Sequence, residues 1–383
     1  MTKRTTWFNI IALGLVSFLT DLGSEVIYPI LPFFFTSLGV SVSLIGLIEG
    51  LAESTASLTK LHFGLFSDKI KKRKVFALAG YTLSSIGKAL LPLAAGPVLL
   101  FGGRFLDRFG KGIRTAPRDA LLAESAQEGK TGAAFGLHRS LDTLGAVGGV
   151  LMAWFLLKNN VELRNIFFIA LIPSFLGIFA LWLVKENKKE LSDKPARKLR
   201  FAWNELPTQL KVFFAASAIF ALGNSSNIFL ILKAMNIGFA ASGAILLYLA
   251  YNASHAILSY PAGIWSDKIG RKNVLLIGYL LYGLIYLVFA FTKSPTIYPF
   301  LFIIYGFYGG LTEGVEKALV ADNSNPEQKA TFQGMHALIV GTLLLPASLL
   351  AGWLWQHVSP SAPFYLSSLT SFIAIIILAK NME

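Results

Sequence analysis

Apolar runs of the length that crosses a lipid bilayer recur from one end of this 383-residue chain to the other. A helix needs about 20 consecutive apolar residues to span the hydrocarbon core. The chain is 54% hydrophobic and 14% charged, whereas soluble proteins carry about 25% charged residues. This pattern predicts an all-α polytopic membrane protein. The length of the chain therefore reflects the number of membrane spans rather than the number of soluble domains.

Twelve spans are predicted where charged or turn residues interrupt the apolar sequence. Their expected bounds are 8–36, 42–66, 75–93, 97–119, 132–158, 164–184, 208–234, 241–266, 273–292, 296–321, 331–357 and 361–380. The first apolar stretch lacks a small-residue cleavage site, so we interpret it as a helix rather than a removed signal. Residues 185–207 form the expected central loop, which separates domains 1–184 and 208–383.

Positive charge is concentrated in alternate loops. IKKRK, KENKKELSDKPARKLR and DKIGRK follow the second, sixth and eighth spans, whereas the loops after the first, third and eleventh spans contain no lysine or arginine. The positive-inside rule therefore predicts that both termini and the central loop are cytoplasmic, in a bacterial inner membrane. The basic residues behind the net charge of +13 are interpreted as determinants of membrane topology that face anionic lipid. No nucleic-acid partner is expected.

The sequence repeats itself once. GLFSDKIKKR at 64–73 matches GIWSDKIGRK at 263–272 with an offset of 199 residues, and ALLAES at 120–125 matches ALVADN at 318–323 with an offset of 198. Two matches in nearly the same register predict two homologous six-helix halves. Parallel repeats of this kind build many transporters.

The repeated decapeptide resembles the signature loop of the major facilitator superfamily, G-x-L-A-D-R-x-G-R-K. The second copy carries the glycines, acid and basic residues of this signature, while Lys71 replaces a glycine in the first copy. The resemblance implies the twelve-helix fold, alternating access and a loop that locks the two halves in the outward-facing state. The signature residues implied to act in gating are Gly64, Asp68, Arg73, Gly263, Asp267 and Arg271. A plain inside-positive loop is the alternative for each copy.

Two further family motifs are present in altered form. Arg104 occupies the arginine of a fourth-span motif, R-x-x-x-G-x-G, and Gly110 and Gly112 follow it, although Arg108 stands at the first glycine of the motif. GAVGG at 145–149 is similar to the G-P-x-x-G-G motif of drug/proton antiporters, but Ala146 stands where proline is expected. This departure disfavours a drug antiporter.

Five cations are crowded into residues 103–119 of the fourth span. Arg104 and Arg108 fall near mid-membrane on one helical stripe with Lys111, and intramembrane charges are functional candidates by default. These two arginines are predicted to bind substrate, with an ion pair to Asp107 or another helix as the alternative. Nearer the cytoplasm, Arg114 and Arg118 are expected to act as interfacial anchors, since long basic side chains reach towards lipid headgroups.

Acidic residues of the first two spans are candidates for proton coupling. Asp21 and Glu25 lie one helical turn apart in the first span, and Glu53 lies in the second. In the family fold the first and fourth spans face the central cavity, so these carboxylates are expected to meet the arginines. An adjacent guanidinium changes the proton affinity of a carboxylate, which can link proton movement to transport. A permanent ion pair without a coupling role is the alternative.

The second half carries neutral polar and aromatic residues at the corresponding positions. Asn224 and Asn227 lie in the seventh span, and Tyr305 and Tyr308 lie in the tenth. We predict that these four residues bind substrate, with ordinary helix packing as the alternative for the tyrosines. Lys88 in the third span has no partner that the sequence identifies.

Motifs typical of enzymes are missing from the sequence. It contains no G-x-x-x-x-G-K, H-E-x-x-H or G-x-S-x-G, and it contains no cysteine, so no enzymatic activity, cofactor or metal is expected. The sequence predicts a monomeric, proton-coupled secondary transporter, either a symporter or an antiporter, for a small anionic solute of the polycarboxylate or carboxylate-siderophore type. The alternatives are a multidrug efflux antiporter for lipophilic cations and a channel.

Overall fold

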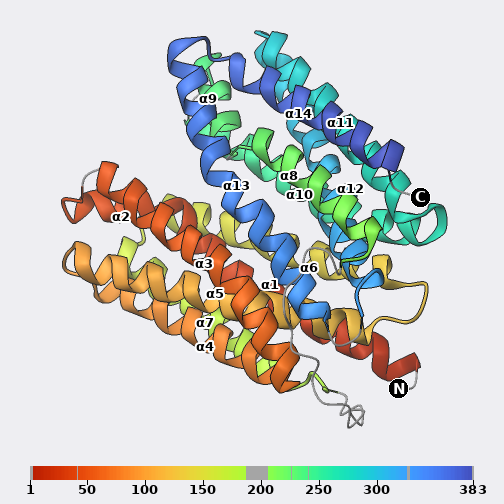
Figure 1. Cartoon of the computed structure of the whole chain (residues 1–383). Helices are drawn as coiled ribbons and strands as arrows, with labels where there is room; N and C mark the ends of the chain where they lie inside the picture. Colours follow the sequence, from red (N-terminus) through yellow and green to blue (C-terminus); the bar gives the residue numbers. More distant parts are fainter. Residues whose placement is uncertain are drawn as a thin grey trace. The chain divides into compact units, whose positions relative to one another are not determined.

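The computed structural model describes residues 3–40, 42–186, 206–225, 227–239, 241–325 and 328–381. Within these ranges the regular structure is helical. The first half contains α1 (Lys3–Ile27), α2 (Leu31–Ser37), α3 (Val42–Ile70), α4 (Arg73–Leu90), α5 (Pro97–Ser125), α6 (Thr131–Lys158) and α7 (Leu163–Leu181). The second half contains α8 (Thr208–Gly223), α9 (Ile228–Asn236), α10 (Ala241–Ile269), α11 (Arg271–Phe291), α12 (Tyr298–Asp322), α13 (Lys329–His357) and α14 (Ala362–Asn381) (Figure 1).

The helices follow the predicted spans, and two spans are interrupted. The first is split by a 3-10 turn, Tyr28–Ile30, because Pro29 lacks the N–H that would continue the helix. The seventh is split between α8 and α9, where Asn224 leaves the helical conformation with φ −84° and ψ 73°. Discontinuous membrane helices expose backbone groups that substrates and ions use.

Seven described segments are long and apolar enough to cross a membrane by length and composition. They are Trp7–Ile30, Arg73–Leu93, Thr131–Lys158, Leu163–Leu181, Arg271–Phe291, Lys329–His357 and Ala362–Lys380. The remaining long helices include α3 and α5, which carry several charged side chains along their lengths. Intramembrane charge is costly, so these helices are where functional residues are expected.

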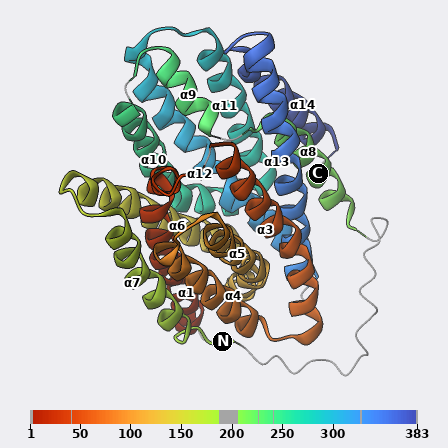
Figure 2. The same ribbon diagram turned by 90° about the vertical axis from the view of Figure 1, so that its left-hand side faces the viewer.

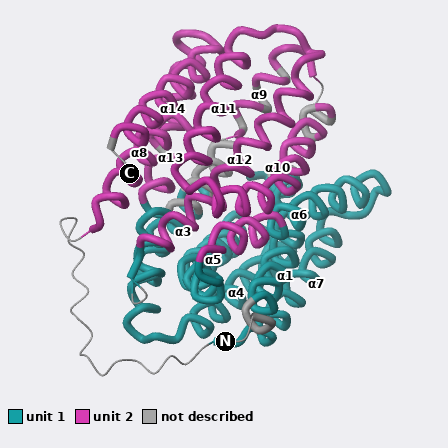
Figure 3. Tube along the Cα trace, turned by 90° about the vertical axis from the view of Figure 1, so that its right-hand side faces the viewer, with its two compact units in different colours: residues 1–128, 141–201, 324–338 teal, residues 129–140, 202–323, 339–383 magenta. Residues whose placement is uncertain are grey.

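The chain divides into two compact units (Figure 3). Unit 1 is Met1–Glu128, Leu141–Phe201 and Ser324–Leu338, and unit 2 is Gly129–Ser140, Ala202–Asn323 and Ile339–Glu383. The first turns of α6 therefore belong to unit 2, and those of α13 belong to unit 1. The boundaries 1–184 and 208–383 of the repeated halves stay a prediction, and most of the central loop lies outside the described residues.

Unit 1 is held together by close helix pairs. The most extensive pairs are α4 with α5, α3 with α5, and α1 with α7, and α4 runs beside α5 in Figures 1 and 2. Glycine permits the first of these contacts, because a Cβ at Gly80 would lie 2.6 Å from the carbonyl oxygen of Gly110. Small residues at such contacts let the backbones of membrane helices approach.

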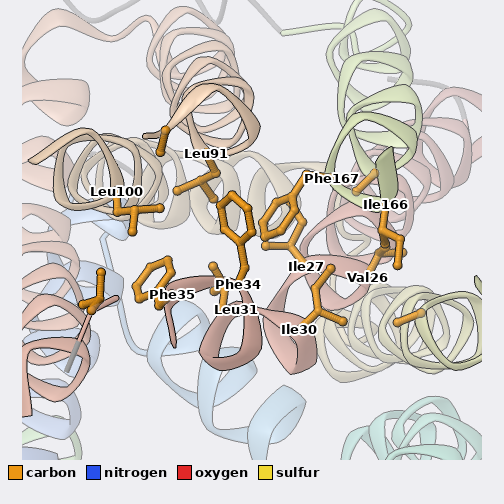
Figure 4. Packing of buried hydrophobic residues seen from close by; sticks show 14 of the residues in the cluster. Val26, Ile27, Ile30, Leu31, Phe34, Phe35, Leu91, Leu100, Ile166 and Phe167 are labelled. Atoms are coloured by element: carbon orange, nitrogen blue, oxygen red, sulfur yellow. The ribbon is translucent and has the colours of Figure 1, made fainter. Parts of the chain in front are cut away.

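Buried apolar side chains of unit 1 form a cluster (Figure 4). It joins the end of α1, the end of α4 and the starts of α5 and α7, and Phe34 packs against Phe167 with ring centroids 4.7 Å apart. Leu91, Leu100 and Ile166 are fully buried in the same cluster. The cluster thus packs together α1, α4 and α5, the helices that carry Glu25, Lys88 and Arg104.

Candidate functional site

Helix α5 carries a row of charged side chains that are almost completely buried. The exposed fractions are 2% for Arg104, 5% for Asp107, 8% for Arg108, 4% for Arg114 and 7% for Arg118. All five lie in unit 1. Burying charge is unfavourable unless each charge is paired and hydrogen-bonded, so the partners of this row indicate what it does.

Asp107 is the shared partner of the two mid-membrane arginines. Its Oδ2 lies 3.1 Å from Nη1 of Arg104 and 3.8 Å from Nε of Arg108. Its other carboxylate oxygen accepts a hydrogen bond of 2.5 Å from the hydroxyl of Ser84 on α4. The ion pair that was the alternative for Arg104 is therefore present in the structure, and the contact with Arg108 is the longer of the two.

The two arginines nearer the end of α5 are not interfacial anchors, which corrects the sequence interpretation. The guanidinium of Arg114 lies 4.1 Å from the ring centroid of Tyr81 on α4. Arg118 donates to Oδ1 of Asp119 at 3.0 and 2.8 Å and to Ser17 of α1 at 3.0 Å. Packing against α1 and α4 gives these side chains partners inside the helix bundle, so they do not extend to the lipid interface.

The candidate proton-coupling residues of α1 lie close to this row. Glu25 is within electrostatic range of Lys111 and Arg108 on α5, of Asp21 on its own helix and of Asp142 on α6. Asp142, which is 6% exposed, is a neighbour that the sequence did not identify. The backbone of Glu53 lies in α3, but its side chain is outside the described residues.

The glycines of α6 bring that helix against α1. A Cβ at Gly149 would lie 2.5 Å from the carbonyl oxygen of Leu22 and 2.9 Å from Cβ of Glu25. The neighbouring Gly148 meets only the side chain of Leu22, at 3.5 Å or more. The GAVGG segment therefore places α6 beside the acidic turn of α1.

Unit 2 brings all four of its predicted site residues together. Tyr305 donates a hydrogen bond of 2.8 Å to Oδ1 of Asn227, and its ring lies 5.6 Å from that of Tyr308. Tyr282 of α11, which the sequence did not single out, donates at 3.4 Å to Oδ1 of Asn224 and lies 4.7 Å from Tyr308. The break between α8 and α9 is thus lined by tyrosine hydroxyls.

Glu316 is a further polar residue of unit 2 that sequence reasoning left out of the site. Its Oε1 accepts a hydrogen bond of 2.9 Å from Tyr279, a fully buried residue of α11. Arg139 of α6 forms an ion pair with Glu313 on the same helix as Glu316. The available signal was the pair of acidic residues, Glu313 and Glu316, inside the predicted span 296–321.

The first signature loop joins four helices within unit 1. Asp68, at the end of α3, accepts hydrogen bonds from the backbone N–H and the hydroxyl of Thr331 on α13, at 2.7 and 2.6 Å. Arg73 lies 2.7 Å from Asp68 and 3.0 Å from Glu124 of α5. Gly64 faces the carbonyl of Ala330. Asp68 lies beyond the predicted span 42–66, and burial raises the pKa of its carboxyl despite the Arg73 guanidinium.

The second signature loop repeats this arrangement within unit 2. Asp267 accepts hydrogen bonds from the backbone N–H groups of Gly132 and Ala133 at the start of α6, at 2.9 and 2.8 Å. Arg271 lies 2.6 Å from Asp267 and 3.0 Å from Asp322. Gly263 packs directly on the backbone of Gly132. In both copies a carboxylate accepts from the start of a helix, where the helix dipole favours negative charge.

Comparison with known families identifies a match over most of the chain. The sequence matches the Major Facilitator Superfamily over residues 13–234 and 212–381. The chain belongs to this superfamily. An uncharacterised MFS-type transporter of Methanocaldococcus jannaschii is 41% identical over 379 residues, which cover 97% of this chain and 94% of the relative. The Multidrug resistance protein MdtH of Proteus mirabilis is 24% identical over 95% of this chain and 92% of the relative.

Solved structures share the fold. The human organic anion transporter TETRAN superposes with a TM-score of 0.82 at 15% identity, over 97% of this chain and 99% of that chain. The Fucose:proton symporter of E. coli superposes with a TM-score of 0.81 at 13% identity, over 99% and 100% of the two chains. The predicted all-helical fold with twelve membrane helices is confirmed. The MFS chain is an integral multi-pass membrane protein and a secondary transporter of a small molecule, not an enzyme.

Proposed function

We propose that this MFS protein is a monomeric, proton-coupled transporter of a small organic anion of the polycarboxylate or carboxylate-siderophore type. The supporting observation is the charge balance around α5. The cations are Lys88, Arg104, Arg108, Lys111, Arg114 and Arg118, and the carboxylates are Asp21, Glu25, Asp107, Asp119 and Asp142. Among the side chains that the structure describes in this group, with every one ionised, six cations face five carboxylates, and an anionic substrate balances the excess positive charge.

The roles of the residues follow from their contacts. Arg108, whose contact with Asp107 is the longer one, is the principal substrate-binding cation, and Arg104 supports it through the same carboxylate. Guanidinium groups bind carboxylates in a bidentate geometry. Asp21, Glu25 and Glu53 are the proton-coupling residues of the proposal.

The remaining predicted residues supply recognition and gating. Asn224, Asn227, Tyr305 and Tyr308 form hydrogen bonds and aromatic contacts with the uncharged part of the substrate. The signature residues act as breakable latches during alternating access; they are Gly64, Asp68, Arg73, Gly263, Asp267 and Arg271. In this proposal the protein lies in a bacterial cytoplasmic membrane, with both termini in the cytoplasm.

Thermal unfolding of the detergent-solubilised protein against a ligand panel tests the substrate class. The panel contains di- and tricarboxylates, phosphorylated solutes, carboxylate siderophores and the lipophilic cation tetraphenylphosphonium. A ligand present at 100 times its dissociation constant stabilises the folded state by about 2.7 kcal/mol. We expect anions to stabilise the wild-type protein, and we expect Arg108→Ala and Arg104→Ala to lose this effect. Lys158→Ala, at an exposed position, is the matched control.

Multidrug efflux is the second candidate function, because the MdtH proteins match this chain over most of its length. Stabilisation by tetraphenylphosphonium alone, unchanged in Arg108→Ala and Arg104→Ala, would favour efflux and contradict anion binding. Proton coupling is tested separately in proteoliposomes. Uptake of a stabilising ligand should be driven by an imposed pH gradient and abolished when a protonophore collapses that gradient.

A further inference from the structure

Lys88 of α4 is a buried cation to which the proposed function assigns no role beyond its charge. Its side chain is 1% exposed, and its Nζ donates hydrogen bonds to Ser24 Oγ at 2.7 Å, to Ser174 Oγ at 3.4 Å and to the backbone carbonyl of Thr20 at 3.4 Å. Ser24 and Thr20 belong to α1, and Ser174 belongs to α7. The ammonium is therefore held at the junction of three helices of unit 1 by neutral oxygen atoms.

Charged groups on two of the packed helices act on this ammonium. The carboxylates of Asp107 on α5 and Asp21 on α1 attract it, while the guanidinium groups of Arg114 and Arg108 on α5 oppose it. From α7 it receives the hydroxyl of Ser174. Neutral hydrogen bonds do not by themselves compensate a buried charge, so the attraction of the two carboxylates is needed to keep Lys88 protonated in this position.

The contact of Lys88 with α1 is specific. Its shortest hydrogen bond is to Ser24, which lies between the two candidate proton-coupling residues Asp21 and Glu25 in sequence. Proton uptake by Asp21 would remove one of the two attractions that hold the ammonium at this junction. The hydrogen bonds by which Lys88 joins α4 to α1 and α7 would then respond to the protonation of Asp21.

We infer that Lys88 is a positioning residue for proton coupling. Its ammonium balances the carboxylates of Asp21 and Asp107, and through its hydrogen bonds the protonation of α1 affects α4 and α7. The inference rests on the proposed proton coupling. In this role Lys88 acts through its charge. A lysine that served only as a packing residue would be insensitive to the ionisation of its neighbours.

The test is the pH dependence of the thermal unfolding midpoint, Tm, of purified protein without ligand. Lys88→Met removes the charge and keeps a long side chain, Lys88→Arg keeps the charge at every pH, and Lys158→Met is the control at an exposed lysine. We expect the decrease in Tm of Lys88→Met to be roughly twice as large at about pH 7 as at about pH 5, because ionised carboxylates need the ammonium most. Lys88→Arg should keep the wild-type pH dependence.

A Tm decrease in Lys88→Met that is equal at every pH would overturn the inference, since it would indicate packing alone. If Lys88→Met does not fold, the double variant with Lys88→Met and Asp21→Asn is measured instead. Recovery of folded protein supports charge compensation, and failure to recover contradicts it. Because this titration uses no ligand, its result is independent of the ligand panel, and the failure of the anion proposal would be seen separately.

Discussion

At the scale of single residues, Asp107 is the centre of the candidate site. Its carboxylate accepts a hydrogen bond from the hydroxyl of Ser84 on α4, and it lies beside Arg104 and Arg108 of its own helix. The sequence places Asp107 among five cations, and it presents the residue as one possible partner of Arg104. The structure adds that both arginines and a neighbouring helix use the same carboxylate, so the residue controls the geometry of the whole group.

Asp107→Asn should therefore destabilise the protein by about 3–5 kcal/mol, because removal of one partner leaves buried cations uncompensated. Chemical denaturation in detergent micelles measures this change. Glu162→Gln, at an exposed position before α7, is the control and should have little effect. Equal stability of the two variants would show that Asp107 does not compensate the arginines.

At the scale of helices, glycines decide which pairs approach closely. Gly149 of α6 faces the backbone of α1, whereas its neighbour Gly148 meets only the side chain of Leu22. The GAVGG segment of this chain thus has a packing function beside the acidic turn of α1, whatever its relation to the antiporter motif that it resembles.

Gly149→Ala should destabilise the protein by about 1–3 kcal/mol, since the added methyl group overpacks the contact with α1. Gly148→Ala should be neutral or slightly stabilising, because alanine is the better helix former and its side chain has room. Thermal unfolding of the two adjacent variants compares them directly. Similar destabilisation by both would argue that the conformational freedom of glycine, rather than close packing, is required in this segment.

The signature loops also act at the scale of helices, since each aspartate accepts from the start of a helix of its own unit. Asp68→Asn should reduce stability by about 3–5 kcal/mol, because Arg73 then loses a buried partner. Lys69→Gln, at the adjacent exposed position, is the control. A stability equal to that of Lys69→Gln would leave Glu124 as a sufficient partner for Arg73 and would contradict the latch.

At the scale of the whole molecule, the matched superfamily describes an MFS transporter, and the two signature aspartates accept hydrogen bonds in a similar way in the two units. The units differ in chemistry. Unit 1 contains the buried charges of α5, and unit 2 contains the tyrosine hydroxyls that surround the break between α8 and α9. This difference supports the proposed division between charge recognition with proton coupling in one unit and shape recognition in the other.

The proposed topology can be measured on intact cells, because the chain contains no cysteine. A single cysteine at Glu128, in the exposed connection after α5, should be protected from a membrane-impermeant maleimide. A single cysteine at Ser294, in the exposed connection after α11, should react. This outcome follows from the positive-inside rule, and the reverse labelling pattern would place both termini outside the cytoplasm.

The sequence by itself determined the positions of the helices, the internal repeat and the family. Apolar length and charged loops suffice for this, since a membrane helix satisfies its backbone hydrogen bonds within its own segment. The signature aspartates and arginines were likewise recognisable, because their motif is short and contiguous. The break at Pro29 could be expected from proline alone, whereas the break after Gly223 carries no comparable signal.

Only the tertiary structure decided which charged side chains share partners. Arg114 rests on Tyr81, Arg118 reaches Ser17, and Lys88 reaches Ser24 across helix contacts that join residues far apart in sequence. Helical periodicity indicates which residues lie on one stripe, but the rotation of each helix and the neighbour it faces depend on packing. The partners of buried charges are therefore set by the fold, and these partners give each of the buried cations its expected role.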